Sequence, residues 1–294
     1  MTSTMEWMSA HLYFEGDPFD TTCDRILLSF VQPIVTKLRT DGLVQRAFFV
    51  RFRDPYPDPR SHVRLRLLTD VTEASKVTDL IERQWNAGGR LKARGMLRWT
   101  PYERETQRYG GIEAMPAIEH LFEASSTLAG DILTPSVIGD RSVRLGKAML
   151  ATIVFFHHFF DDRREWTDVV RRHAHRLLHT QDGAEEARVE FLDAVRARSH
   201  AQRSDILRIV EDVEAGDLPP GPFSAFGREV SVARGDLKAL CDAGRLCVYG
   251  KLENWGLVSD ALAGSLVHMT NNRIGIERLE ENLLTLLLWE CLND

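Results

Sequence analysis

Residues 47–54 read AFFVRFRD and residues 62–68 read HVRLRLL, and a proline-rich segment at 54–61 joins them. Alternating apolar and polar residues that include many aromatic and branched side chains are typical of strands, so both stretches predict neighbouring strands of one sheet. An earlier stretch, SAHLYFEG at 9–16, alternates in the same way. Strand signals are therefore concentrated in the first third of the chain, where a further strand pair is expected around 96–106.

The strand at 62–68 has two unlike faces, because side chains alternate along a strand. Its apolar face is formed by Val63, Leu65 and Leu67. Its other face carries His62, Arg64 and Arg66. A charge buried without a partner is strongly unfavourable, so this second face must meet either solvent or a cavity. The apolar strands on both sides favour a central position, and a cationic face on a central strand indicates a cavity.

The rest of the chain is predicted to be mainly helical. One helix is expected at 22–41, with a kink at Pro33, and another near 72–87. Helical spacing of apolar residues recurs near 113–128, 141–160, 165–179, 184–199, 203–214, 234–243, 258–271 and 276–291. The fold class is therefore α+β: a mostly antiparallel sheet from the N-terminal third, covered by helices from the C-terminal two-thirds, with the last helix pair closing a cleft. A single domain over 1–294 is expected, with 217–227 as the candidate internal boundary.

The overall composition is that of an ordinary globular protein, with 44% hydrophobic and 27% charged residues. The formal net charge of −6 argues against general nucleic-acid binding, because neutralising phosphates requires a basic surplus. The sequence shows no secretory signal, and no apolar stretch approaches the roughly 18 residues typical of a membrane-spanning helix. We therefore expect a cytoplasmic protein that does not associate with membranes.

No metal site and no cofactor are expected. The four cysteines match no metal-binding spacing; they are Cys23, Cys241, Cys247 and Cys291. Cys241 could pair with Cys247, but buried or free thiols are the expected state in the cytoplasm. Nothing resembles a phosphate-binding loop, a dinucleotide-binding glycine turn or a nucleophile elbow.

Two further segments contain residues capable of acid–base or anion chemistry. The first, 102–111, carries Glu105 and Arg108 ahead of a glycine pair, and the two side chains can converge if the backbone turns there. Taken alone, such a pair is typical of the protein surface. In the second, 262–273, the apolar residues form a helical stripe, and His268 and Asn272 lie together beside it. A lone histidine on a helix is most simply a structural residue.

Taken in order, these segments resemble the C-terminal, elimination domain of class I lantibiotic dehydratases and its stand-alone relatives in thiopeptide biosynthesis. The matching residues run from Trp7 and the strand at 11–14, through 49–55, 62–66 and 102–111, to 268–273. Two departures bear on substrate fit. Six residues, 56–61, separate Pro55 from His62 where the family has about two, and residues 122–126 read FEASS where relatives read Phe-x-x-Asp-Ser.

The resemblance implies a lyase that removes glutamate from glutamylated Ser or Thr of a precursor peptide, leaving dehydroalanine or dehydrobutyrine. A separate protein would perform the glutamylation, so no direct tRNA binding is expected, and the peptide would arrive with its leader. The implied catalytic residues are His268, Arg66, Arg108 and Glu105. The implied substrate-binding residues are Arg64, His62, Tyr109, Asn272, Arg273 and Ser265.

His268 is expected to be the base or proton carrier, and the arginines are suited to carboxylates and developing negative charge. For Glu105, orientation of an arginine and a share in proton transfer both stay open. Arg64, Arg66, Arg108 and His268 are expected to converge on one cavity.

Two other functions remain open. The first is a thiopeptide pyridine synthase, which joins two dehydroalanines in a formal aza-[4+2] cycloaddition and closes a macrocycle; the long loop at 56–61 and the altered segment at 122–126 favour it. The retained arginine–histidine set favours elimination, because a cyclising enzyme has less use for a glutamate pocket. The second is a non-catalytic peptide-binding scaffold of a biosynthetic complex. The sequence leaves the oligomeric state open.

Overall fold

The computed structural model describes residues 4–87, 94–180 and 185–293. The chain divides into two compact units, each of which is described by itself. The first comprises Met1–Glu105, Phe122–Arg141 and Asn272–Gly275, and the second comprises Thr106–Leu121, Ser142–Asn271 and Ile276–Asp294. The candidate boundary at 217–227 lies inside the second unit. The assignment of a single domain stays a prediction.

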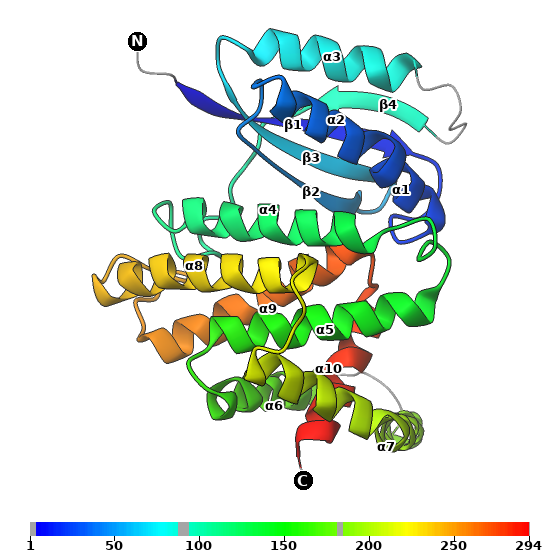
Figure 1. The fold of residues 1–294 in the computed structure, drawn as a ribbon, viewed down its shortest axis with the longest axis vertical. Helices are drawn as coiled ribbons and strands as arrows, with labels where there is room; N and C mark the ends of the chain where they lie inside the picture. Colours follow the sequence, from blue (N-terminus) through cyan, green and yellow to red (C-terminus); the bar gives the residue numbers. More distant parts are fainter. Residues whose placement is uncertain (1–3, 88–93, 181–184, 294) are drawn as a thin grey trace. The chain divides into compact units, whose positions relative to one another are not determined.

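The first unit is built on a four-stranded sheet with the order β2-β3-β1-β4 (Figure 1). Its strands are β1 (Met5–Phe14), β2 (Arg46–Arg53), β3 (Ser61–Asp70) and β4 (Arg94–Trp99). All three pairings are antiparallel. This arrangement confirms the α+β class, the antiparallel sheet and the central position of the strand at 62–68.

The predicted strand pair around 96–106 is wrong in one respect: only β4 forms, and residues 100–105 are not in a strand. Pro101 explains the end of β4, because proline has no backbone N–H to donate to a neighbouring strand. Residues 88–93, which precede β4, lie outside the described residues.

Helices from the N-terminal third cover the sheet within the first unit (Figure 1). They are α1 (Thr21–Ile26), the π-helix η1 (Leu27–Val31), α2 (Gln32–Thr40) and α3 (Ala74–Ala87). The ring of Phe30 packs edge-on against Trp85 at 5.0 Å between centroids, which joins η1 to α3. The single helix predicted at 22–41 is thus three pieces, and the π-helical turn directly precedes the predicted kink at Pro33.

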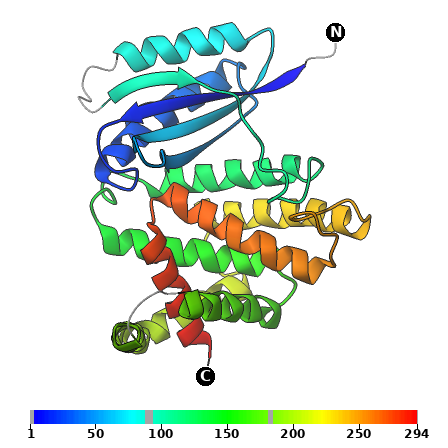
Figure 2. The ribbon, with the colours of Figure 1, turned by 180° about the vertical axis from the view of Figure 1, so that it is seen from behind.

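The second unit is helical (Figure 2). Its elements are α5 (Arg141–Phe159), α6 (Arg163–Thr180), α7 (Glu185–Ala215), α8 (Pro222–Asp242), α9 (Trp255–Ile274), α10 (Arg278–Leu292) and the start of α4 (Met115–Ile132). The predicted helices 184–199 and 203–214 are one continuous helix, α7, because no glycine or proline interrupts it. The helix predicted at 234–243 begins earlier, at Pro222, a residue type favoured in the first helical turn.

Aromatic side chains form much of the core of the second unit. The ring of Phe155 stacks on Phe159 at 4.9 Å between centroids, and Phe156 stacks on Trp166 at 6.0 Å. At the other end of the unit, α10 packs against both α6 and α7. Residues of α6, α9 and α10 line the cavity described below.

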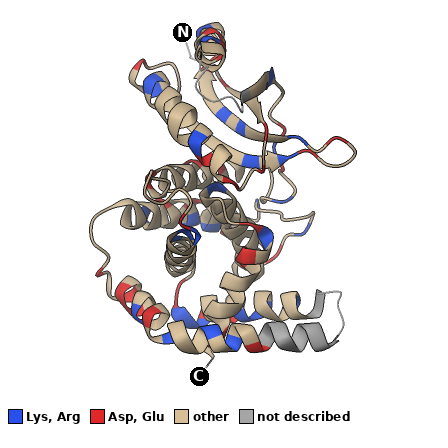
Figure 3. Ribbon diagram, turned by 90° about the vertical axis from the view of Figure 1, so that its right-hand side faces the viewer, with Lys and Arg blue, Asp and Glu red and all other residues tan. Residues whose placement is uncertain are grey.

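Charge is distributed differently over the two units (Figure 3). Basic residues recur along the strands of the sheet, whereas the helices of the second unit carry both signs. None of the described helices combines the length and apolar character needed to cross a bilayer. Within the same residues, no three His, Cys, Asp or Glu side chains cluster as a metal ion would require. All four cysteines are free, including Cys241 and Cys247.

Candidate functional site

The cationic face predicted on β3 is present, and β1 extends it. The register pairs His11 with Arg64 and Ser9 with Arg66, which puts residues of both strands on one face. The Nε of Arg64 donates to Nε2 of His62 at 3.1 Å. An Nη1 of Arg66 lies 3.3 Å from Nε2 of His11. We call His11, His62, Arg64 and Arg66 the strand-face cluster.

Both histidines of the strand-face cluster are neutral at physiological pH. Burial, together with the nearby His62, Arg66 and Arg64, lowers the pKa of His11 to about 3. Burial also lowers the pKa of His62, which is fully buried. The hydroxyl of Thr100 lies 2.9 Å from the same Nε2 of His11 that faces Arg66, so this nitrogen acts as an acceptor. Neutral histidines that accept from arginines orient the guanidinium groups without cancelling their charge.

The two arginines of the cluster are supported by aromatic rings. The guanidinium of Arg64 lies over Phe52 at 3.2 Å from the ring centroid, and that of Arg66 lies over Tyr102 at 5.1 Å. Burial, together with the charge of Arg64, lowers the pKa of Arg66 to about 10, so Arg66 still carries its charge at neutral pH. Among the described residues neither arginine forms an ion pair, and the positive charge of the face is therefore available to an anionic group.

Glu105 lies at the end of the first unit and is exposed. Burial lowers the pKa of Arg64, and the charges of Asp54 and Glu105 oppose that shift. Glu105 therefore interacts electrostatically with the strand-face cluster. This contact is compatible with orienting an arginine, and its role stays a prediction.

Asn272 and Arg273 are buried within the first unit, where they bind other parts of the protein. The side-chain amide of Asn272 accepts from the backbone N–H of Arg51 and donates to the same residue's carbonyl, both at 3.0 Å. The Nε of Arg273 donates to the hydroxyl of Ser126 at 3.1 Å, and its guanidinium lies over Phe122. These contacts give both side chains a structural role. Their contacts with substrate stay a prediction.

The second unit contains a cavity of about 360 Å³ between α6, α9 and α10. It is lined by Arg108, His173, Arg176, Leu177, Asp260, Ala261, Gly264, Ser265, His268, Arg278, Glu281, Asn282 and Thr285. We call it the α9–α10 cavity. Three residues selected from the sequence, Arg108, Ser265 and His268, meet here although they come from segments far apart in the chain. Three arginines and two carboxylates give the lining a positive formal charge when its histidines are neutral.

Arg108 is positioned by a turn that depends on glycine. The Nε of Arg108 donates to the hydroxyl of Ser265 at 3.0 Å, and its guanidinium lies over the buried ring of Tyr109. Gly110 has a φ of 94°, and a Cβ at this position would lie 2.9 Å from the side chain of Leu246. Both the positive φ and the close approach require glycine, which explains the pair noted after Arg108.

His268 contacts a carboxylate that the sequence did not single out. Its Nδ1 lies 2.7 Å from Oε2 of Glu281, which comes from the first turn of α10. The other oxygen of Glu281 accepts from Arg278 at 3.2 Å. Glu281 and Arg278 were missed because they lie on a different helix from His268, and no spacing within one helix connects them.

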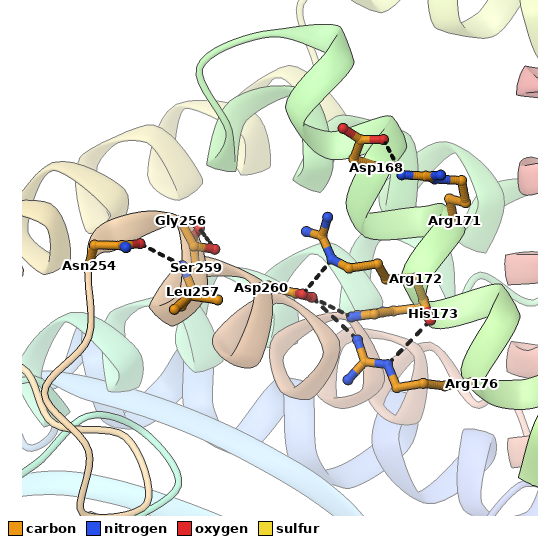
Figure 4. A network of polar contacts seen from close by, with 10 residues as sticks. All are labelled: Asp168, Arg171, Arg172, His173, Arg176, Asn254, Gly256, Leu257, Ser259 and Asp260. Atoms are coloured by element: carbon orange, nitrogen blue, oxygen red, sulfur yellow. Dashed lines mark hydrogen bonds and ion pairs between the residues drawn. The ribbon is translucent and has the colours of Figure 1, made fainter.

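A second polar network crosses the same cavity (Figure 4). Asp260 on α9 accepts from Arg172 at 2.8 Å, contacts Nε2 of His173 at 2.9 Å and accepts from Arg176 at 3.4 Å, all three on α6. Burial by itself would raise the pKa of Asp260, but hydrogen bonds and charges from His173 and Arg172 outweigh burial and lower it. Asp260 therefore ties α6 to α9 as an ionised carboxylate.

The structure thus sorts the predicted residues into two sets. The set in the first unit comprises His62, Arg64, Arg66, Glu105, Asn272 and Arg273. The set in the second unit comprises Arg108, Tyr109, Ser265 and His268. Convergence is observed among His62, Arg64 and Arg66 on β3, and among Arg108, Ser265 and His268 in the cavity.

Comparisons with known proteins support the resemblance drawn from the motifs. Over 159 residues, 53% of this chain and 14% of the relative, the chain is 27% identical to the subtilin biosynthesis protein SpaB of Bacillus subtilis. The pyridine synthase TbtD from thiomuracin biosynthesis superposes with a TM-score of 0.69 at 14% identity, covering 97% of both chains.

The tRNA-dependent lantibiotic dehydratase MibB from Microbispora sp. 107891 superposes with a TM-score of 0.63 at 16% identity, covering 97% of this chain and 28% of MibB. At these identities the two structures show a shared fold. The family described as lantibiotic biosynthesis dehydratase C-term matches residues 7–292, almost the whole sequence. The chain belongs to this lantibiotic dehydratase C-terminal family.

Proposed function

We propose that this protein is a lyase that eliminates glutamate from glutamylated Ser or Thr residues of a ribosomal precursor peptide. The observation that carries the proposal is the meeting of His268, Arg108 and Ser265 in the α9–α10 cavity. In the reaction, His268 takes the α-proton of the esterified residue. The electrons of that C–H bond form the Cα–Cβ double bond, the Cβ–O bond breaks, and glutamate leaves as a carboxylate.

The charges of the cavity suit this reaction. Removal of the α-proton builds negative charge on the adjacent carbonyl oxygen, and departure of glutamate builds it on the leaving carboxylate. Arg108, Arg176 and Arg278 line the cavity, and Arg108 is held there by its hydrogen bond to Ser265. Preorganised cationic groups of this kind lower the barrier because they need no reorganisation as charge develops.

The strand-face cluster is proposed to bind carboxylate groups of the substrate. Arg64 and Arg66 present planar guanidinium groups that match a carboxylate, and neutral histidines and aromatic rings fix their orientation. The net charge of −6 agrees with a separate glutamylation protein handling tRNA, while this chain receives the glutamylated peptide with its leader.

The direct test is mass spectrometry of a glutamylated precursor peptide after incubation with the protein. We expect each ester to lose one glutamic acid and to leave a dehydroalanine or dehydrobutyrine. The control reaction contains the His268→Ala variant, which should leave the esters intact. If the wild-type protein leaves them intact as well, the proposed elimination is wrong.

One observation favours a second function, that of a pyridine synthase. The pyridine synthase TbtD superposes on this chain with a TM-score of 0.69, compared with 0.63 for MibB. The same incubation with a dehydroalanine-containing peptide separates the two. A cyclised product together with inert glutamylated peptide would establish cyclisation in place of elimination. Binding of the peptide without either product would point to a scaffold.

A further inference from the structure

We infer that Glu281 is a positioning residue that makes His268 a base with its Nε2 available to the substrate. The inference rests on the proposed elimination, in which His268 takes the α-proton. It adds a second side chain to that step, one supplied by a helix outside the recognised motifs.

The contact between the two side chains determines where the imidazole carries its proton. A carboxylate accepts hydrogen bonds and cannot donate them. Because Oε2 of Glu281 lies 2.7 Å from Nδ1 of His268, the hydrogen of the neutral ring is on Nδ1. The lone pair is then on Nε2, which has no hydrogen-bond partner within the described part of the chain. His268 lines the α9–α10 cavity, so this basic nitrogen is the one that a bound substrate can reach.

Arg278 contacts both members of this pair. Its Nη1 lies 3.2 Å from Oε1 of Glu281 and 3.3 Å from Nδ1 of His268. The guanidinium can only donate to Nδ1 and the carboxylate can only accept from it, and the carboxylate contact, at 2.7 Å, is the shorter of the two. Glu281 is thereby fixed through both oxygens, and its side chain is 11% exposed.

The location of Glu281 also favours a carboxylate. It lies in the first turn of α10, where the partial positive charge of a helix N-terminus stabilises an acidic side chain. The packing of α10 against α6 and α7 fixes the direction from which the carboxylate approaches His268.

The other histidine of the cavity is arranged differently. His173 contacts Asp260 through Nε2, and Asp260 also accepts from Arg172 and Arg176. A carboxylate shared among three basic groups is suited to joining two helices. Glu281 instead leaves the Nε2 of its histidine open to the cavity, which is the arrangement that proton abstraction requires.

The first test is kinetic and uses Glu281→Gln, which keeps the shape of the side chain and removes its charge. A glutamine can present its amide N–H to Nδ1 and so favour the other tautomer. Loss of an orienting carboxylate in the comparable serine-protease arrangement costs about 10⁴-fold in kcat, and we expect a loss of at least about 100-fold in glutamate release here, with KM changed less than about twofold. Glu280→Gln is the matched control on the same turn, and it should react like wild type. Glu281→Asp should recover part of the lost rate.

The second test reads the tautomer directly and needs no turnover. In a ¹⁵N NMR spectrum of the full chain with labelled histidine, the His268 signals are identified by their loss in His268→Gln. We expect Nδ1 protonated in wild type and in Glu280→Gln, and a shift toward protonated Nε2 in Glu281→Gln. A wild-type His268 protonated on Nε2, or an unchanged tautomer together with unchanged kcat in Glu281→Gln, would overturn the inference. If the wild-type protein releases no glutamate, the proposed function fails separately, and the NMR result still decides the tautomer.

Discussion

The strand-face cluster and the α9–α10 cavity both contain arginine and histidine, yet they use them in opposite ways. On the sheet, Arg64 and Arg66 are supported by neutral histidines and aromatic rings, and they form no ion pair among the described residues. In the cavity, His268 contacts Glu281 and His173 contacts Asp260. The arginines of the sheet therefore keep their charge available, whereas each of these histidines of the cavity is paired with a carboxylate.

This difference separates two chemical tasks. Uncancelled arginines on a rigid strand are suited to binding a carboxylate, because their charge is not already satisfied within the protein. A histidine paired with a carboxylate is suited to moving a proton, because its tautomer and orientation are fixed. We propose carboxylate binding for the strand-face cluster and proton transfer for the cavity, and each of the following predictions tests one of these two roles.

The largest effect is expected for His268→Ala. Removal of a positioned base typically costs 10²- to 10⁴-fold, so kcat for glutamate release should fall by about 10³-fold. The affinity for the glutamylated peptide, measured by fluorescence anisotropy, should change less than about twofold. His200→Ala, on the exposed side of α7, serves as the control. A variant that loses peptide binding and keeps its kcat would reverse the roles assigned to the two regions.

An intermediate effect is expected for Arg66→Gln. A charge-assisted hydrogen bond contributes about 1.5–3 kcal/mol, so kcat/KM should fall roughly 10- to 100-fold, mainly through KM. Steady-state kinetics across peptide concentrations separates the two constants. The matched control is Arg83→Gln on α3, an exposed arginine that donates to the carbonyl of Asp79. A fall in kcat alone would mean that Arg66 acts on the transition state and not on binding.

The smallest effect concerns the pH dependence of stability. The pKa of His11 is about 3 in the folded protein, below the 6.5 of an unperturbed histidine. Between these values the unfolded chain binds a proton that the folded chain does not, so the free energy of unfolding decreases as pH falls below about 6.5. His11→Gln removes this titration while keeping an acceptor for Arg66.

Urea denaturation at pH 7 and pH 5 measures the difference. The wild type should lose more stability than His11→Gln over this range, by on the order of 1 kcal/mol after allowing for solvent screening. The lowered pKa of His158, about 4, acts in the same direction in both proteins and cancels in the comparison. Equal losses in the two proteins would mean that His11 is not held neutral and that the strand-face cluster is less buried than described.

Much of the sheet could be predicted from local pattern. The alternation in 62–68 assigns Arg64 and Arg66 to one face and Val63 to the other, because side chains on a strand alternate whatever surrounds it. The helices were predicted in outline for the same reason, since amphipathic spacing is a local property. The limits of several elements differ from the prediction. The helix α7 is continuous where two helices were expected, and residues 100–105 do not form a strand.

The partners of these residues could not be predicted in the same way. His11 meets Arg66 only through the register of β1 and β3, and Glu281 meets His268 only because the chain turns between α9 and α10. Asn272 and Arg273 belonged to a recognisable motif, yet their observed contacts are with the protein itself.

The sequence by itself determined the α+β class, the cationic strand face and, through its motifs, the family. Periodicity and the order of motifs can be read from the linear sequence, because each depends on residues that are neighbours in it. Only the tertiary structure decided which histidines are neutral and support arginines, and which ones contact a carboxylate. Burial and pairing depend on residues brought together from distant segments, and a side chain's protonation follows from those surroundings.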